Sequence, residues 1–148
     1  MHSNNETSDP YDLRRFVDAQ DVLYEQVLSE LQHGEKQSHW MWFVFPQIQG
    51  LGHSSTARKF AISSLDEANA YLAHPILGPR LLECTKLVNE IQGRTIDEIF
   101  GSPDDMKFRS CMTLFAHAAS TEGTNRIFQD ALDKYFAGKP DSLTVERL

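Results

Sequence analysis

The sequence predicts an all-α fold, a single compact domain of about seven or eight helices. Apolar residues recur at spacings of three and four along most of the chain, which is the period of a helix with one buried face. Serine, threonine and aspartate stand where many of these runs begin, and glycine or proline stands where most of them end. With 148 residues, 41% of them hydrophobic, the chain can bury a core of its own.

A long helix is predicted first, beginning at Asp9 and Pro10 and stopping at Gly34. The aspartate can cap the first turn, and a proline at the first helical position costs no hydrogen bond. An apolar stripe runs from Leu13 to Leu31 along this helix. That stripe must pack against other segments of the chain.

The stretch 38–52, SHWMWFVFPQIQGLG, holds both tryptophans of the protein. Its apolar run could be a short helix or a buried strand, and periodicity alone does not decide. No second convincing strand exists to pair with it, so a strand would leave its backbone groups unsatisfied. We therefore expect a short helix capped by Ser38 and ending near Pro46. The two tryptophans cannot share one side of it, so we expect one in the core and the other near a pocket or the surface. We place Trp40 in the core with Phe43 and Val44, and Trp42 at the edge.

The later segments also carry helix signals. Ser64 with Glu67, and Thr95 with Glu98, have the spacing of capping boxes. The acidic pair 104–105 favours the positive end of a helix dipole. The expected order is a short turn after Ser54, a helix from Ser64 to His74, one from Pro75 to Gly93, a short turn from Thr95 to Gly101, a helix starting at Ser102, a long helix ending at Gly138 and a final turn after Asp141.

Residues 1–8 are polar and lack the basic start and apolar run of a signal peptide, so we expect a short disordered tail before the domain 9–148. The longest apolar run, 40–45, is far shorter than the roughly 20 residues that span a bilayer. Cys84 and Cys111 lie in apolar segments without CxxC spacing, which favours buried reduced thiols. A cytoplasmic location is therefore expected.

The charge balance limits the partners. The chain has 14 basic and 21 acidic residues, a net charge of -7, which repels the phosphate backbone of nucleic acids and anionic membrane surfaces. We expect neither as a partner. A local basic pocket could still bind a small anion.

The sequence shows no glycine-rich nucleotide motif, no P-loop, no nucleophile elbow and no zinc-binding spacing, so no cofactor or metal is predicted. No complete catalytic constellation can be read from it. What remains is a set of candidate ligand-binding residues: His39, Trp42, Gln47, Gly50, Gly52, Arg58, Asp104 and Lys107.

Each candidate could bind a ligand for a chemical reason, and each also has a commoner structural role. His39 beside the tryptophans could grip a ring, although such a histidine more often caps or fills a core. Glycines next to Arg58 could let backbone amides approach an anion, although tight turning is their usual role. Asp104 and Lys107 place opposite charges at a helix N-terminus, where capping already explains the acid.

Several motifs, in order along the chain, resemble a family of bacterial proteins catalogued as domain of unknown function 1810, whose members often carry the label calpastatin. The motifs are DPYDLRRFVDAQ, SHWMWFVFPQIQGLG, ISSLDEANAYLAHPILGPRLLECT and FGSPDDMKFRSCMTLFAHAA. The resemblance implies an all-α fold and no established activity, substrate or catalytic residue. The label implies a protease inhibitor that is disordered in isolation, whereas the apolar segments here predict a globular core.

Two hypotheses of different classes follow. The first is a site for an anionic or nucleotide-like metabolite, with turnover left open, formed by the candidate residues. The second is a noncatalytic protein-interaction module that presents an aromatic groove to a partner. A deep cleft would favour the first, and a flat exposed aromatic patch would favour the second.

Overall fold

The computed structural model describes residues 8–118 and 122–148, which contain nine helices and one isolated β-bridge. The helices are α1 (Arg14–Gln32), α2 (Met41–Val44), α3 (Ser55–Lys59), α4 (Leu65–Ala73), α5 (Leu77–Glu90), α6 (Ile96–Phe100), α7 (Asp104–Ala118), α8 (Glu122–Phe136) and α9 (Ser142–Glu146). The all-α prediction is confirmed. Apart from Ser8, the predicted tail 1–8 lies outside the described residues. Within the described ranges no helix is long and apolar enough to cross a membrane.

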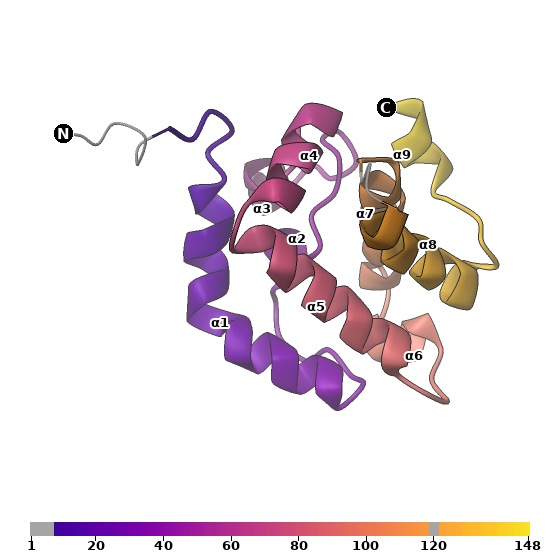
Figure 1. Ribbon diagram of the computed structural model, residues 1–148. Coiled ribbons are helices and arrows are strands. Elements are labelled where there is room, and N and C mark those ends of the chain that lie inside the picture. Colours follow the sequence, from indigo (N-terminus) through magenta and orange to yellow (C-terminus); the bar gives the residue numbers. More distant parts are fainter. Residues whose placement is uncertain (1–7, 119–121) are drawn as a thin grey trace.

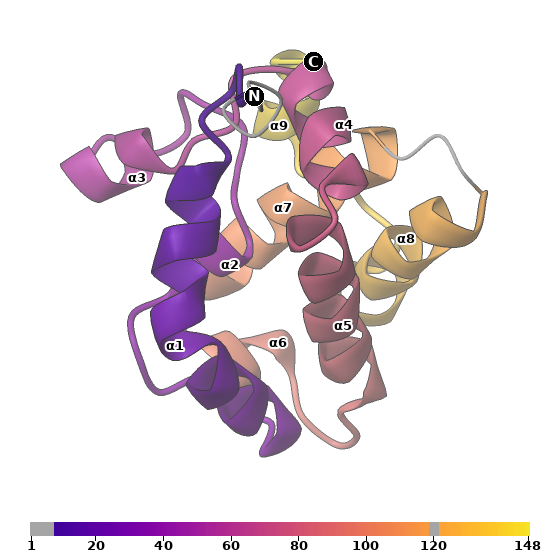
Figure 2. The same ribbon diagram turned by 60° about the vertical axis from the view of Figure 1, so that its left-hand side comes forward.

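Helix α7 is the centre of the fold. It packs against α4, α6, α8 and α9, and every residue from 110 to 115 is buried, which is more than a full helical turn. In Figure 1, α5 crosses the molecule between α1 on the left and α8 on the right, and it contacts both. Figure 2 shows α3 at the outer edge, away from the other helices.

Helix α1 begins at Arg14, four residues later than Pro10, where the sequence pattern places its start. The Asp9 carboxylate does accept from the backbone amides of Leu13 and Arg14, at 2.8 and 3.0 Å. Asp12, which lies between Asp9 and the helix, has a positive φ of 52° and so makes a turn before α1. Asp9 thus does accept from amides at the start of α1, but the N-cap residue is Leu13, and the predicted helix start was wrong.

The aromatic stretch forms a single helical turn, α2, so the choice of helix over strand is confirmed. Beyond it the chain is extended, and Ile48 makes a parallel bridge with Ile62. The amide of Gln49 donates to the Ile62 carbonyl, and the amide of Ile62 donates to the Gln47 carbonyl, each at 2.8 Å. This bridge fixes the segment after α2 against the segment after α3.

A buried carboxylate sets the start of that turn. Glu30, on α1, accepts from the indole of Trp40 at 2.9 Å, the amide of Gln37 at 2.7 Å and the hydroxyl of Ser38 at 2.7 Å. Because the Ser38 hydroxyl is used here, it does not cap α2, which starts at Met41 instead. Trp40 is 0% exposed, as predicted.

The same contacts control the titration of Glu30. Burial raises its pKa, but the hydrogen bonds from Gln37, Ser38, Trp40 and Gln26 outweigh burial and lower the pKa from an ordinary 4.5 to about 2. The charged form of Glu30 therefore stabilises the folded protein above pH 4.5.

Replacing Glu30 should destabilise the protein in a pH-dependent way. We expect Glu30→Gln to lower the free energy of unfolding by about 1–3 kcal/mol at pH 7, because buried donors lose a charged acceptor. The difference from wild type should shrink as the pH falls from 4.5 towards about 2, where Glu30 becomes protonated. Urea unfolding at pH 7 and pH 3 measures both effects. Glu25→Gln, at an exposed position of α1, is the matched control, and an equal loss in the two variants would contradict this role of Glu30.

Candidate ligand-binding site

Two adjoining cavities lie beside the aromatic stretch. Their volumes are about 380 and 490 Å³, within the usual range for small-molecule sites. We call the pair the Trp42 site, the smaller one the cationic cavity and the larger one the apolar cavity. The residues lining both are Trp42, Gln47, Gly52, His53 and Ala57.

The cationic cavity is lined by two arginines and by no acidic residue of the described ranges. Arg58 comes from α3, and Arg147 follows α9. In the described part of the chain neither guanidinium has an ion-pair or hydrogen-bond partner. Two like charges near each other raise the free energy of the empty site and lower that of a site holding an anion.

The loop 50–53, which precedes α3, adds backbone donors to the cationic cavity. Within residues 8–118 and 122–148, the amides of Gly50, Gly52 and His53 donate no hydrogen bond to another protein group, whereas the amide of Leu51 closes the turn at 49–50. Gly50 and Gly52 have no side chain to cover the backbone, and both line the cationic cavity. Gly50, Gly52 and His53 line the same cavity as the two guanidinium groups, and free amides beside such groups suit an anion.

Arg147 reaches this loop because α9 docks on α7. The Asp141 amide donates to the Thr113 hydroxyl of α7 at 2.9 Å. The Asp141 carboxylate caps α9 by accepting from the amide and hydroxyl of Thr144, at 3.0 and 2.6 Å. The guanidinium of Arg147 then lies directly against Gly50, where any Cβ atom would touch it.

The apolar cavity lies on the α7 side of Trp42. Most of its wall is hydrocarbon, and two side chains at its edge, Met106 and Leu143, are 45% and 58% exposed. Its apolar lining residues are Trp42, Leu51, Ala57, Pro103, Met106 and Leu143. Exposed apolar side chains that border a hollow favour the binding of an apolar group there.

A chain of charged contacts positions the lysine of the apolar cavity. The ammonium group of Lys107 lies 5.0 Å from the centroid of the Trp42 ring, a cation–π contact. Asp104 holds it at 3.4 Å and also pairs with Lys36 at 2.9 Å. Asp104 lines neither cavity, so it acts through Lys107 and touches no ligand there.

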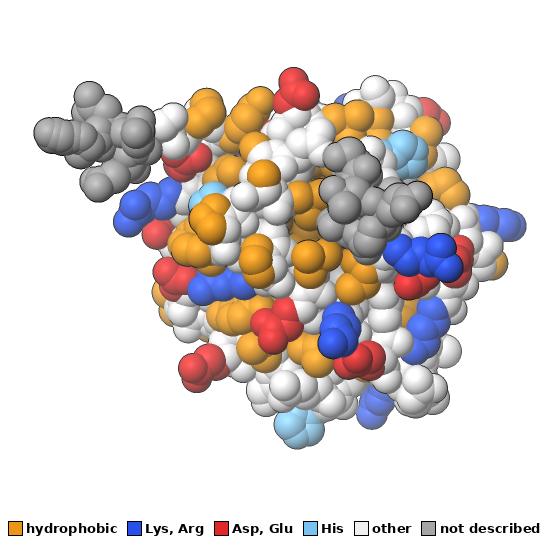
Figure 3. Space-filling model, in the orientation of Figure 1, with side chains coloured by type: hydrophobic (Ala, Val, Ile, Leu, Met, Phe, Trp, Pro, Cys, Tyr) orange, Lys and Arg blue, Asp and Glu red, His pale blue; other side chains and the backbone are white. Residues whose placement is uncertain are grey.

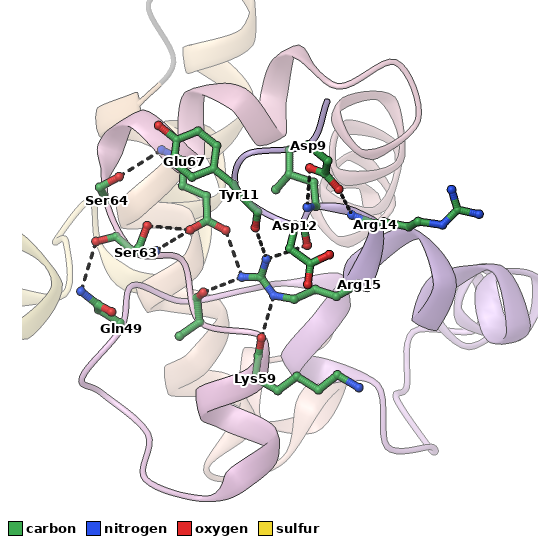
Figure 4. A network of polar contacts seen from close by, with 12 residues as sticks. Asp9, Tyr11, Asp12, Arg14, Arg15, Gln49, Lys59, Ser63, Ser64 and Glu67 are labelled. Carbon is green, nitrogen blue, oxygen red and sulfur yellow. Dashed lines mark hydrogen bonds and ion pairs between the residues drawn. The ribbon is translucent and has the colours of Figure 1, made fainter. Parts of the chain in front are cut away.

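The outer wall of the site is held to α1 by one side chain. Arg15 donates to the carbonyls of Lys59 and Ala61, at 2.7 and 2.8 Å, and pairs with Glu67 at 3.0 Å (Figure 4). Glu67, 3% exposed, also accepts from the amide and hydroxyl of Ser63. These contacts fix the end of α3, from which Arg58 projects.

The structure brings most of the predicted residues together. Six line the Trp42 site: Trp42, Gln47, Gly50, Gly52, Arg58 and Lys107. His39 is exposed and lines neither cavity, because Trp40 next to it turns into the core. Asp104 reaches the site only through Lys107.

Several lining residues were not among the candidates, and the two that matter most for charge and hydrogen bonding in the cationic cavity are His53 and Arg147. His53 lies between Gly52 and the α3 cap Ser54, so its place in the glycine loop was the signal that could have found it. Arg147 had no sequence signal, because its place depends on how α9 docks. For metals, no group of three or more histidine, cysteine or acidic side chains converges in the described ranges.

Comparisons with known proteins agree with the fold but name no activity. A family model described as "Protein of unknown function (DUF1810)" matches residues 10–148. No curated protein matches the chain. Among solved structures, the chain is similar to the conserved hypothetical protein Rv1873 from Mycobacterium tuberculosis, with 56% sequence identity and a TM-score of 0.91. That similarity covers 95% of this chain and 98% of the other.

The contact between Gly50 and Arg147 gives a stability prediction. Gly50 has a φ of 96°, so Gly50→Ala should cost about 1–3 kcal/mol of unfolding free energy through backbone strain. Gly93→Ala is the matched control, since Gly93 has a φ of 75° and a Cβ atom there would meet no other atom within 4 Å. We expect similar losses by urea unfolding, because the flexible Arg147 side chain can move aside. A much larger loss for Gly50→Ala would show that Arg147 is fixed in place.

Proposed function

The chain belongs to the DUF1810 family, whose description states no activity, and from its own geometry we propose that it binds a small organic anion in the Trp42 site. The observation that carries the proposal is the pair Arg58 and Arg147, which line one cavity without a carboxylate partner among the described residues. In a protein with a net charge of -7, acidic side chains are abundant, yet none of those described lines this cavity. An anion from solution would supply the missing charge.

The apolar cavity supports an organic anion over an inorganic one. A ligand held by the arginines can extend past Trp42, because both cavities share that residue and Gly52. Burying its carbon atoms against Met106 and Leu143 would add a hydrophobic contribution of about 25 cal/mol per Å². Turnover is not part of the proposal.

The hollow shape favours a small molecule over a protein partner. The alternative, an interaction module with an aromatic groove, calls for an exposed aromatic surface, and Trp42 is instead half-buried between two cavities. Basic and acidic side chains are interspersed over the face seen in Figure 3. Together with the net charge, this supports the expectation that nucleic acids and anionic membranes are not partners.

A cytoplasmic location is part of the same proposal. Cys84 and Cys111 are free and buried. Burial raises the pKa of the Cys84 thiol to about 12 and that of Cys111 well above its ordinary value. Such thiols remain protonated and unreactive, which suits a reducing compartment.

Tryptophan fluorescence tests the proposal. A panel of organic anions, carboxylates and phosphates, is titrated into the protein, and binding should change the emission of Trp42. Trp42→Phe should abolish this response, while Trp40, buried against Glu30, keeps its emission.

The arginines should set the affinity. We expect Arg58→Gln or Arg147→Gln to weaken binding of any responding anion by about tenfold or more, through loss of a charge-assisted hydrogen bond. Arg126→Gln is the control, since it removes the same charge from a side chain that is 79% exposed and lines neither cavity. If no anion in the panel binds, or if all three variants bind alike, the proposal is wrong.

A further inference from the structure

The two cavities differ in chemistry, and this difference identifies a ligand class. Resting on the proposed function, we infer that the Trp42 site binds a phosphate monoester of a planar ring compound, the class that includes nucleoside monophosphates. The phosphate occupies the cationic cavity, and the ring occupies the apolar cavity.

The cationic cavity matches a phosphate better than a carboxylate. A carboxylate needs only one guanidinium group, which binds it with two parallel hydrogen bonds. This cavity has two guanidinium groups, those of Arg58 and Arg147. A phosphate monoester carries about 1.5–2 negative charges at pH 7 and three terminal acceptor oxygens. Those oxygens can use both arginines together with the amides of Gly50, Gly52 and His53, which have no protein acceptor in the described ranges.

The glycines make the close approach of a phosphate possible. At Gly52 a side chain is excluded already, because a Cβ atom there would lie 2.7 Å from the Cβ of Ala57 in α3. The loop therefore packs tightly on α3 and leaves its backbone uncovered towards the cavity. The same residue borders both cavities, so a ligand that contacts Gly52 can reach either one.

The apolar cavity matches a flat ring. Trp42 offers an aromatic surface, and the unbranched thioether of Met106 adapts its shape to a ring packed against it. Pro103 and Leu143 complete an apolar wall. Lys107, held by Asp104, adds a donor at the edge of this wall, which suits ring nitrogens or carbonyl oxygens.

The experiment dissects one probe into its parts. Isothermal titration of the full chain compares adenosine 5′-monophosphate, adenosine, which lacks the phosphate, and ribose 5-phosphate, which lacks the ring. We expect the monophosphate to bind at least tenfold more tightly than either part. A peptide that carries phosphotyrosine, which offers the same ring-phosphate chemistry on a protein, is the fourth ligand.

Two variants assign the parts to the cavities. Arg58→Gln should weaken the monophosphate and ribose 5-phosphate by tenfold or more and leave adenosine unchanged. Met106→Asn, a neutral change at a position 45% exposed, should weaken the monophosphate and adenosine and leave ribose 5-phosphate unchanged. Thermal unfolding confirms that both variants fold.

The possible outcomes distinguish failure of the proposed ligand class from failure of the proposed anion-binding function. If an aromatic carboxylate from the fluorescence panel binds at Trp42 as tightly as the monophosphate does, the phosphate assignment is wrong while the anion site stands. Equal binding of ribose 5-phosphate and the monophosphate overturns the ring assignment. Binding of the phosphotyrosine peptide at least tenfold more tightly than the monophosphate overturns the small-molecule assignment. If no organic anion of any class binds, the proposed function fails as well.

Discussion

The pairing of Arg15 with Glu67 is the contact on which the shape of the Trp42 site depends. The Arg15 side chain is 13% exposed and that of Glu67 is 3% exposed, and the pair joins α1 to the start of α4. Removing one partner of a buried pair is costly because the other is left charged and unpaired. Because Arg15 also donates to the carbonyls of Lys59 and Ala61, it fixes the end of the small outlying helix α3.

The contacts of Arg15 and two further interactions place the residues of the Trp42 site. Ile62 lies just beyond the carbonyls that Arg15 holds, and its bridge to Ile48 places the loop 47–53 against α3. The docking of α9 on α7 closes the other side and brings Arg147 to the loop. A site for a charged ligand is thus built from short segments that are held by longer helices, an arrangement common for binding loops.

The sequence predicted the fold better than the site. Helical spacing was sufficient to locate the long helices, although not the start of α1. Helix geometry predicted that the two tryptophans play different roles, and Trp40 is the buried one although it lies just outside α2. Ser38 was misassigned because a distant carboxylate, Glu30, takes the hydroxyl that local rules give to the cap. Arg147 could not be found, since only tertiary docking gives it a role. Sequence patterns predict contacts between residues that are close in the chain, whereas the Trp42 site is assembled from segments that are far apart in it.

Hydrogen–deuterium exchange of the backbone amides tests the central claim most directly. With adenosine 5′-monophosphate at saturation, we predict slower exchange for the amides of Gly50, Gly52 and His53, which are free of protein acceptors within the described ranges. Exchange in the buried part of α7 should not change. Unchanged exchange in the loop, or protection confined to another surface, would contradict a ligand site at Trp42.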